Sequence, residues 1–455
     1  MKKIIILLFI TLVYSSCKKL IEVNSPKNQL TTVDVFSDTT SAVAALGNIY
    51  AQLDRTIEVN YSKYLDMYTD NLDYTGSTPQ DLEFFKSTIS VSNSTDLAIW
   101  KNFYFIIYQC NDLIEHLPKS TKLPVANINL LSNEAKFLRA YAYFYLINLY
   151  GKVTLVLSTD INLSSQAPQS EISAIYQQII KDLADAKQGL PANYPGNGKV
   201  RANKWAAAAL LSRVYLFQKN WPAAETEATE VINSGLYSLL STPNNVFLAG
   251  SDEAILQVWT QNGFVTSATN LVPSSNTSLP RYPMSTNLFN AFESGDLRKN
   301  AWIGTSNVKS GSLTTTYHYL SKYKNRVPNT TSPEYLMALR LAETYLIRAE
   351  ARSQQAKVTG VGSAADDLNL IRKRAGIANT TATTQSGMLT AILQERRVEL
   401  FDEWGSRFLD LKRTGQLNPV IGMYKTTWLS TAALLPIPLN ELTYDHNLVQ
   451  NPGYH

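Results

Sequence analysis

The sequence predicts a mostly α-helical fold: a tetratricopeptide-like helical repeat scaffold with one irregular, loop-rich face and a few short strands. Three observations support this prediction. Apolar residues recur at three- and four-residue steps over much of the chain from Thr40 onward. Residues 204–234 and 340–375 fit the spacing of a tetratricopeptide helix pair. Between these two segments, residues 240–335 are interrupted by prolines and rich in Ser, Thr and Asn.

The composition narrows the possible function classes. The chain has 455 residues, of which 45% are hydrophobic and 17% are charged, and its formal net charge is +4. An aromatic-rich, weakly charged chain of this kind is not disordered. Lys2 and Lys3 lie in a segment that we expect to be removed, so the remaining basic surplus is too small for a nucleic-acid binder. A surface of neutral polar groups and tyrosines suits neutral polar ligands, and the alternative is a Tyr-rich core.

The N-terminus has the features of an export signal. Two lysines precede a ten-residue apolar run, which is too short to span a bilayer as a helix of about 20 residues. Small residues come directly before Cys17, as in a lipoprotein signal. We therefore expect a signal peptide at residues 1–16, lipidation of Cys17 and a lipidated tether at residues 17–40. Ordinary secretion with a stray cysteine is the alternative.

The only other cysteine, Cys110, falls in a strongly apolar helical pattern. This position predicts a buried free thiol, and a Cys17–Cys110 disulfide is the alternative. Two cysteines in an exported chain of this size indicate that the fold does not depend on a disulfide framework.

Helical patterns organise residues 41–455, which we expect to form a single domain. We expect tetratricopeptide-like helix pairs at about 131–235 and 340–376. Apolar spacing and punctuating Pro or Gly residues predict the remaining helices of the first half. The first expected helix begins at Thr40. The other helices expected before residue 204 cover residues 59–72, 96–117, 131–150 and 170–189.

Two irregular segments, at about residues 74–95 and 240–335, interrupt the helical pattern. Short strand signals are present at Ala254–Trp259 and at Thr315–Tyr323, where Tyr317, Tyr319 and Tyr323 share one parity. Binding residues concentrate on loops that a rigid scaffold positions. We therefore expect the ligand-binding face to be built from these two segments.

Several sequence blocks, in order along nearly the whole chain, resemble the SusD/RagB family of outer-membrane nutrient-uptake lipoproteins. The most recognisable is NEAKFLRAY at 133–141, which continues to LYG at 149–151. The others are CKKLIEV at 17–23, LTT at 30–32, LAETYLIRAE at 341–350, NLIRKRAG at 369–376, ERRVELF at 395–401, RFLDL at 407–411, LPIP at 435–438 and NPGY at 451–454.

The resemblance implies a SusD-like fold with four tetratricopeptide-like helix pairs and one irregular face. It implies a lipoprotein of the outer membrane, facing the cell exterior, that forms a lid on a SusC-like TonB-dependent transporter. It further implies a binding protein for oligosaccharides, or less often for peptides, without catalysis and without a cofactor.

The residues themselves offer little enzyme chemistry. The four histidines, His116, His318, His446 and His455, include no pair at metal-ligand spacing, so no metal site is expected. A glycosidase would need two carboxylates across a glycosidic bond. Glu395 and Glu399 are one helical turn apart, but arginines are interleaved with them.

Such interleaving favours structural ion pairs, which lower the pKa of carboxylates and make them unsuitable as general acids. We interpret two other groups of neighbouring residues as ion pairs of the same kind. These are Glu134 with Arg139, and Glu343 or Glu350 with Arg348.

The irregular segments supply the residue types that sugar binding needs. Tyr and Trp rings stack on sugar faces, while charged and amide groups bind hydroxyls. The candidate ligand-binding residues are Tyr74, Asp81, Arg281, Tyr282, Trp302, Tyr317 and Tyr319, with His318 between the last two. Two alternatives remain. One is a peptide-binding protein of the RagB type on the same scaffold, and the other is a tetratricopeptide-type scaffold for protein assembly.

Overall fold

A computed structural model describes residues 36–58, 61–261, 263–328 and 331–454. The predicted signal peptide, most of the predicted tether and Cys17 lie outside the described residues. Cys110 is buried, as predicted. Within the described ranges, no helix combines the length and the apolar character that crossing a membrane requires.

The prediction of a mostly helical fold with a few short strands is confirmed. In the first half, the described helices are α3 (Thr39–Glu58), α4 (Tyr61–Tyr68), α5 (Pro79–Lys86), α6 (Ser94–His116), α7 (Val125–Tyr150), α8 (Ile161–Ser164), α9 (Ile172–Gly189), α10 (Lys204–Phe217) and α11 (Trp221–Asn233). The fourth expected helix begins earlier than predicted, because Pro124 rather than Leu131 marks the start of α7.

The second half contains both short sheets. Its helices are α12 (Val265–Leu271), α13 (Thr286–Phe289), α14 (Leu297–Trp302), α15 (Leu341–Gln354), α16 (Ala364–Arg374), α17 (Gln385–Leu400), α18 (Ser406–Arg413), α19 (Leu417–Tyr424) and α20 (Leu439–Tyr444). Strand β1 (Ala254–Val258) pairs antiparallel with β4 (Leu336–Arg340), and β2 (Ile303–Ser310) pairs antiparallel with β3 (Leu313–Leu320).

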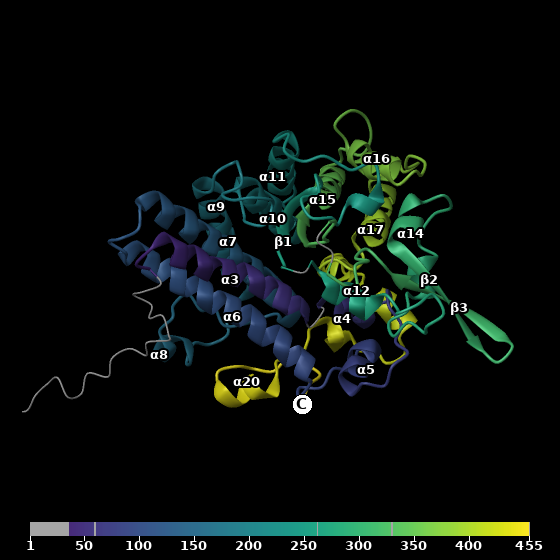
Figure 1. Cartoon of the computed structure of the whole chain (residues 1–455), viewed down its shortest axis with the longest axis horizontal. Helices are drawn as coiled ribbons and strands as arrows, with labels where there is room; N and C mark the ends of the chain where they lie inside the picture. The colour runs from purple at the N-terminus through teal and green to yellow at the C-terminus, as the bar shows by residue number, and fades with distance from the viewer. Residues whose placement is uncertain (1–35, 59–60, 262, 329–330, 455) are drawn as a thin grey trace, which may run out of the picture.

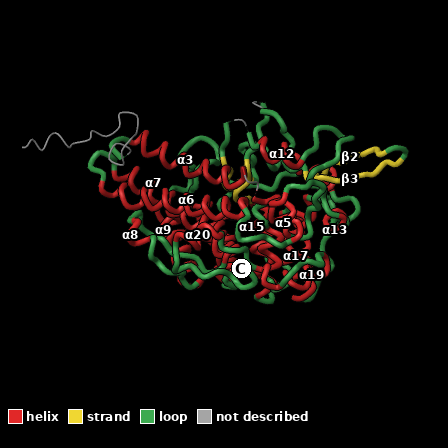
Figure 2. Tube along the Cα trace, turned by 90° about the horizontal axis from the view of Figure 1, so that it is seen from below, coloured by secondary structure: helices red, strands yellow, loops and turns green. Residues whose placement is uncertain are grey.

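Successive helices pack side by side, so that α6, α7, α9, α10, α11 and α15 form one continuous layered body (Figure 1). Helix α7 lies at its centre, because every residue from 137 to 147 is buried. A helix that is apolar on all sides needs neighbours on all sides. The β2–β3 hairpin instead projects from the opposite end of the molecule (Figure 2).

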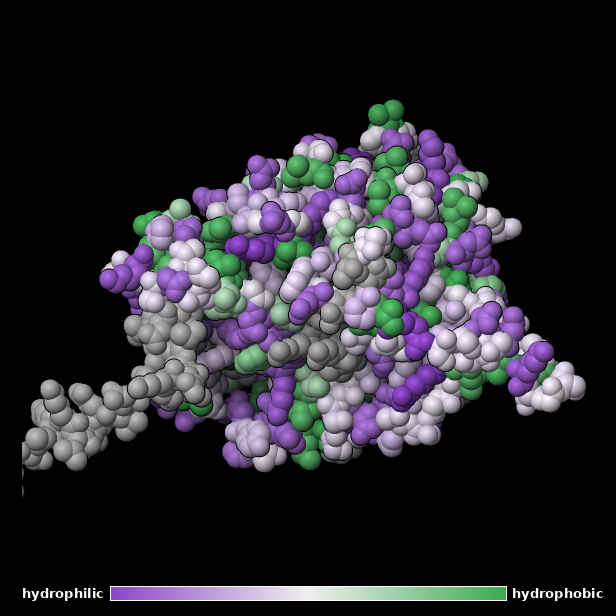
Figure 3. Space-filling model, viewed as in Figure 1, coloured by the Kyte–Doolittle hydropathy of each residue, from purple (hydrophilic) through white to green (hydrophobic). Residues whose placement is uncertain are grey.

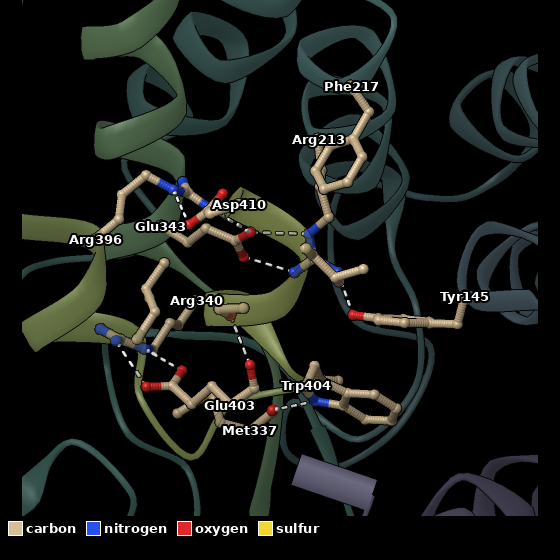
Figure 4. A pocket seen from close by; sticks show the side chains of 14 residues that line it. Tyr145, Arg213, Phe217, Met337, Arg340, Glu343, Arg396, Glu403, Trp404 and Asp410 are labelled. Atoms are coloured by element: carbon tan, nitrogen blue, oxygen red, sulfur yellow. Dashed lines mark hydrogen bonds and ion pairs between the residues drawn. The ribbon is translucent and has the colours of Figure 1, made fainter. Parts of the chain in front are cut away.

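Buried ion pairs hold α14, β4, α16 and α17 together. We call the set Arg298, Lys322, Arg340, Arg374, Glu253, Asp296, Glu395, Glu399 and Glu403 the buried ion cluster. A second group, which includes the Arg213–Glu343 and Arg396–Asp410 pairs, lies beside it (Figure 4). The cavity between the two groups measures only about 20 Å³, which is too small for a sugar or a peptide.

The structure confirms that Glu395 and Glu399 form ion pairs, but with different partners from those predicted. Arg298 donates to both carboxylates, at 2.6 Å to Glu395 and 2.8 Å to Glu399. The predicted lowering of the pKa holds for Glu399. It is wrong for Glu395, whose pKa is raised because burial outweighs the nearby arginines.

The other residues of the predicted pairs also form ion pairs, but not with the predicted partners. Glu134 pairs with Arg201, Arg139 with Asp182, Glu343 with Arg213, Glu350 with Arg413, and Arg348 with Asp367. Each charged residue therefore reaches across to another element rather than to the neighbour on its own helix.

One buried carboxylate gives a prediction about pH. Asp402 follows α17 with a left-handed backbone (φ 56°), and its Oδ2 atom has no hydrogen-bond partner among the described residues. Burial, and then the charge of Asp66, raise the pKa of Asp402 well above its ordinary value. The folded state therefore holds a proton that the unfolded state releases, and this contribution to stability is lost as the pH rises above about 4.

Asp402→Asn removes that titration, and Asn accepts a left-handed backbone. We expect the urea midpoint of the variant, relative to the wild type, to increase between pH 4.5 and pH 7.5. As a control, Asp38→Asn should show no such increase, because hydrogen bonds from Ser41 lower the pKa of exposed Asp38. A constant difference between Asp402→Asn and wild type at both pH values would contradict the prediction.

Candidate functional site

The two irregular segments meet through a short backbone ladder. The amide of Asp73 donates to the carbonyl of Pro283 at 2.8 Å, and the amide of Thr75 donates to that of Arg281 at 3.1 Å. Both segments lack regular structure here, so these bonds satisfy backbone groups that a helix or sheet would otherwise satisfy. The ladder places Tyr74 beside Arg281 although about two hundred residues separate them.

Asp81 lies at the centre of the side chains that this ladder brings together. It accepts hydrogen bonds from Tyr64 (2.8 Å) and Tyr282 (2.7 Å), and it pairs with Arg281 at 3.1 Å. Burial alone would raise the pKa of Asp81. The hydrogen bond from Tyr282 and the charges of Lys63 and Arg281 prevail, so the pKa is lowered and the carboxylate is ionised.

A buried lysine completes the cluster. The Lys63 ammonium donates to the Tyr282 hydroxyl at 3.1 Å and lies 4.2 Å from the ring centroids of both Tyr64 and Tyr282. Burial lowers the pKa of Lys63 to about 8, and the nearby Asp81 opposes that shift. Hydrogen bonds and ring contacts therefore hold Lys63, Asp81 and the two tyrosines in place beneath Arg281.

Arg281 is the member of the cluster that reaches the surface. Its side chain is 52% exposed, whereas Tyr74, Asp81 and Tyr282 are buried. The Tyr74 ring lies nearly parallel to the Tyr282 ring, with centroids 5.5 Å apart, and the Tyr74 hydroxyl accepts from the amide of Thr78. Four of the predicted residues are thus together, with three of them supporting the position of Arg281.

A pocket of about 490 Å³ opens beside this cluster, at the base of the β2–β3 hairpin. The segment 73–75, the stretch 283–289 and strand β3 all contribute to its walls. The lining residues are Asp73, Thr75, Pro283, Met284, Thr286, Phe289, Thr316, Tyr317 and His318. The face drawn in Figure 3 intersperses hydrophilic and hydrophobic residues, and the hairpin extends from its lower right.

One wall of the pocket is a stacked pair of rings. The Phe289 and His318 rings are parallel within 3°, with centroids 3.7 Å apart, and the Lys299 ammonium lies 3.9 Å from the Phe289 centroid. Burial, and then the charge of Lys299, lower the pKa of His318, so its imidazole is neutral at pH 7. The pocket thus offers aromatic surface and neutral hydroxyls together with one carboxylate, that of Asp73.

The two tyrosines of β3 differ in position. Tyr317 lines the pocket. Tyr319 is not among the lining residues and is paired with Gly304 on β2. An added Cβ at Gly304 would lie 2.1 Å from the Tyr319 ring, so this glycine leaves the space that the ring fills.

Trp302 does not belong to this surface. Its side chain is completely buried, its indole N–H donates to the carbonyl of Pro243 at 2.9 Å, and the Lys322 ammonium lies 4.7 Å from its ring. A side chain with no exposed surface offers no ring for a ligand to stack on. The prediction of Trp302 as a ligand contact is therefore corrected: it is a core residue beside the buried ion cluster.

Several residues that line the pocket were not among the ligand-binding residues predicted from the sequence. Phe289 met the same criterion as the chosen aromatics, because it lies in the same irregular segment. Asp73, Thr75 and Thr286 carried no comparable signal. Within the described ranges, no group of three or more His, Cys, Asp or Glu side chains is arranged to hold a metal ion.

Two family models match most of the chain. Residues 19–216 match a model described as "Starch-binding associating with outer membrane", and residues 276–454 match the SusD family model. The chain belongs to the SusD/RagB family. The resemblance seen in the sequence is thereby confirmed.

SusD-like relatives align over nearly the full length of the chain. SusD-like protein P25 of Formosa agariphila is 24% identical, with 99% of each chain covered. A solved laminarin-binding SusD-like protein is 27% identical, with a TM-score of 0.76 and coverage of 91% of this chain and 99% of that one. Surface glycan-binding protein A of Bacteroides thetaiotaomicron, solved with laminarihexaose, has a TM-score of 0.76 at 21% identity and covers 90% of this chain and 99% of its own.

Proposed function

We propose that this SusD/RagB protein binds an oligosaccharide at the cell surface and delivers it to a SusC-like TonB-dependent transporter in the outer membrane. In this proposal the protein captures the ligand without catalysis or a cofactor, and lipidated Cys17 anchors it to the membrane, facing the exterior. The signal-like N-terminus and the family description support that location.

The pocket at the base of the hairpin is the observation that supports an oligosaccharide as the ligand. Its aromatic walls, Tyr317 and the Phe289–His318 pair, suit the apolar faces of sugar rings, and its hydroxyl groups suit their hydroxyls. Arg281 adds an exposed donor close by. With a neutral imidazole and one carboxylate in the walls, a neutral glycan is favoured over a strongly charged ligand.

The ligand of a similar protein supports the same class of ligand. The laminarin-binding SusD-like protein is similar to this chain at 27% identity over almost its whole length. We therefore place laminarin, a β-glucan, and starch first in a panel of polysaccharides. The experiment is affinity electrophoresis of the chain from Lys18 onward, with a peptide mixture tested alongside.

Tyr317→Ala should weaken binding of the retained polysaccharide by about tenfold, because a well-placed aromatic contact contributes more than 1 kcal/mol. Tyr317→Phe should restore most of the affinity, since it keeps the ring. Tyr108, an exposed tyrosine on α6, supplies the matched control, and Tyr108→Ala should bind like the wild type. Unchanged binding by both Tyr317→Ala and Arg281→Met would exclude this pocket as the site.

The peptide-binding alternative has one observation in its favour. The β2–β3 sheet has only two strands. On the outer edge of β3 the carbonyl of His318 already accepts from the amide of Met284, so a peptide would have to pair with the rest of this edge. An extended peptide could add to such an edge. Retention by peptides without retention by any glycan would favour this alternative.

A further inference from the structure

A second hollow, separate from the proposed glycan pocket, lies where residues of α6, α8 and α20 meet. Figures 1 and 2 both show α8 and α20 close to α6 at the end of the molecule opposite the hairpin. The hollow measures about 320 Å³. The residues that line it are Trp100, Tyr104, Thr154, Val156, Ile161, Ser164, Ser165, Glu441, Tyr444, Asp445 and Leu448.

Three aromatic side chains form the apolar part of this hollow. Trp100 and Tyr104 lie one turn apart on α6, with ring centroids 5.1 Å apart. The Tyr104 hydroxyl donates to the carbonyl of Thr154 at 3.0 Å, which fixes the ring as a wall. Tyr444 at the end of α20 is 76% exposed, so its ring stands free at the rim.

Two carboxylates face the same hollow from the C-terminal segment. Glu441 and Asp445 are four residues apart, and neither forms a salt bridge among the described residues, although Asp445 accepts from the amide of Asn447 at 2.9 Å. Burial raises the pKa of Glu441, against the charge of Lys101 and a hydrogen bond from Trp100. Glu441 thus has a nearby positive charge but no salt bridge among the described residues, in contrast to the paired carboxylates of the buried ion cluster.

Aromatic rings and two carboxylates without a salt bridge among the described residues suit a cation better than a neutral sugar. Ring faces attract an ammonium or guanidinium group, and the attraction strengthens as water is excluded. A carboxylate adds a charge-assisted hydrogen bond. We propose that this hollow binds a protonated amine or guanidinium group carried on an apolar stem, with Glu441 and Asp445 contacting the cation and Tyr104 and Tyr444 its stem.

The rim suggests where such a cation comes from. Ile161, which lines the hollow, is 72% exposed, and Leu163 on the same short helix is 65% exposed. Large apolar side chains held in water beside a pocket are typical of a protein contact surface. A Lys or Arg side chain of a partner protein, flanked by apolar residues, would satisfy both the hollow and its rim. A free amine is the other source, and it would use the hollow alone.

Ligand-observed NMR with the chain from Lys18 onward tests the proposal. The probes are N-butylguanidinium and its uncharged analogue N-butylurea. We expect only the charged probe to bind, more weakly at high salt. Glu441→Gln and Asp445→Asn should each weaken its binding by about tenfold. Glu230→Gln, which changes a carboxylate on α11 outside the hollow, should have no effect.

A second arm distinguishes the two sources of the cation. The peptide acetyl-Gly-Leu-Arg-Leu-Gly-amide should bind more tightly than N-butylguanidinium if the apolar rim takes part, and its citrulline version should not bind. Equal affinity of peptide and small probe would assign the hollow to a free amine. Thermal melting of each variant checks that it is folded.

Three results would overturn the proposal: no binding of either cationic probe, equal binding of N-butylurea, or an equal loss of binding with Glu230→Gln. The inference does not depend on glycan binding. A failure here would leave the proposed function standing, and a failure of the glycan experiment would leave this hollow unaffected.

Discussion

Arg340→Met should lower the free energy of unfolding by about 3–5 kcal/mol, the cost of removing one partner from a buried ion pair. Arg340 is buried and donates to Glu403 at 2.6 and 2.8 Å, to Glu253 at 2.9 Å and to Glu399 at 2.6 Å. Its removal leaves three buried carboxylates short of a positive charge. Met fills a similar volume, so the loss reports charge rather than packing.

A surface pair provides the control for this measurement. Lys357 pairs with Glu225, and its side chain is about half exposed, so Lys357→Met should cost less than about 1 kcal/mol. Urea denaturation at pH 7 measures both variants. Similar small losses would mean that the cluster does not depend on Arg340.

The buried ion cluster should lose stability in acid. Burial acts to raise the pKa of Glu399, but the charges of Arg374, Arg340 and Arg298 hold it well below its ordinary value. The stability that Glu399 contributes is therefore present above about pH 4.5 and is lost as the pH falls below it. The advantage of the wild type over Arg340→Met should shrink in acid.

Trp302→Ala should be comparably destabilising, by about 3–5 kcal/mol, because it removes the largest fully buried side chain and leaves a cavity. Its neighbours Phe247 and Phe401 contact the indole ring edge-on, at 5.7 and 6.1 Å between centroids. Thermal melting measures this loss. The glycan affinity of the protein that remains folded should not change, in contrast to Tyr317→Ala.

The Trp302 variant also decides between two interpretations of the residue. A protein that melts like the wild type but loses glycan affinity would restore the original prediction of a ligand contact. Loss of stability with intact affinity would support the burial seen in the structure.

The helices were predictable because their signal is local. Three- and four-residue apolar spacing requires only the residues of one helix, and α3, α6 and α9 begin within two residues of their expected positions. The existence of ion pairs was predictable, but the partner of each charged residue was not. Charged residues on apolar helices must be paired, but Arg201 reaches Glu134 from 67 residues away, and no local pattern specifies that partner.

The site was predictable as a region rather than as a set of contacts. Irregular, aromatic-rich segments do surround the pocket, and Tyr317 lines it. The burial of each side chain was not predictable, because the position of a residue in a loop does not show which other residues cover it. Trp302 lies in an irregular segment, yet it is the last residue of the short helix α14 and its side chain packs into the core.

The region around α4 contacts segments that lie far from it in the sequence. Asp70 binds Arg397 and Arg407, the amide of Trp404 donates to Ser62, and the ladder from Asp73 reaches Pro283. Contacts separated by more than three hundred residues form slowly, because long loops must close first. A nascent chain that has not yet received residues 397–407 lacks the partners of Asp70. The surroundings of the ladder that borders the pocket are therefore complete only after residues 397–407 have been synthesised.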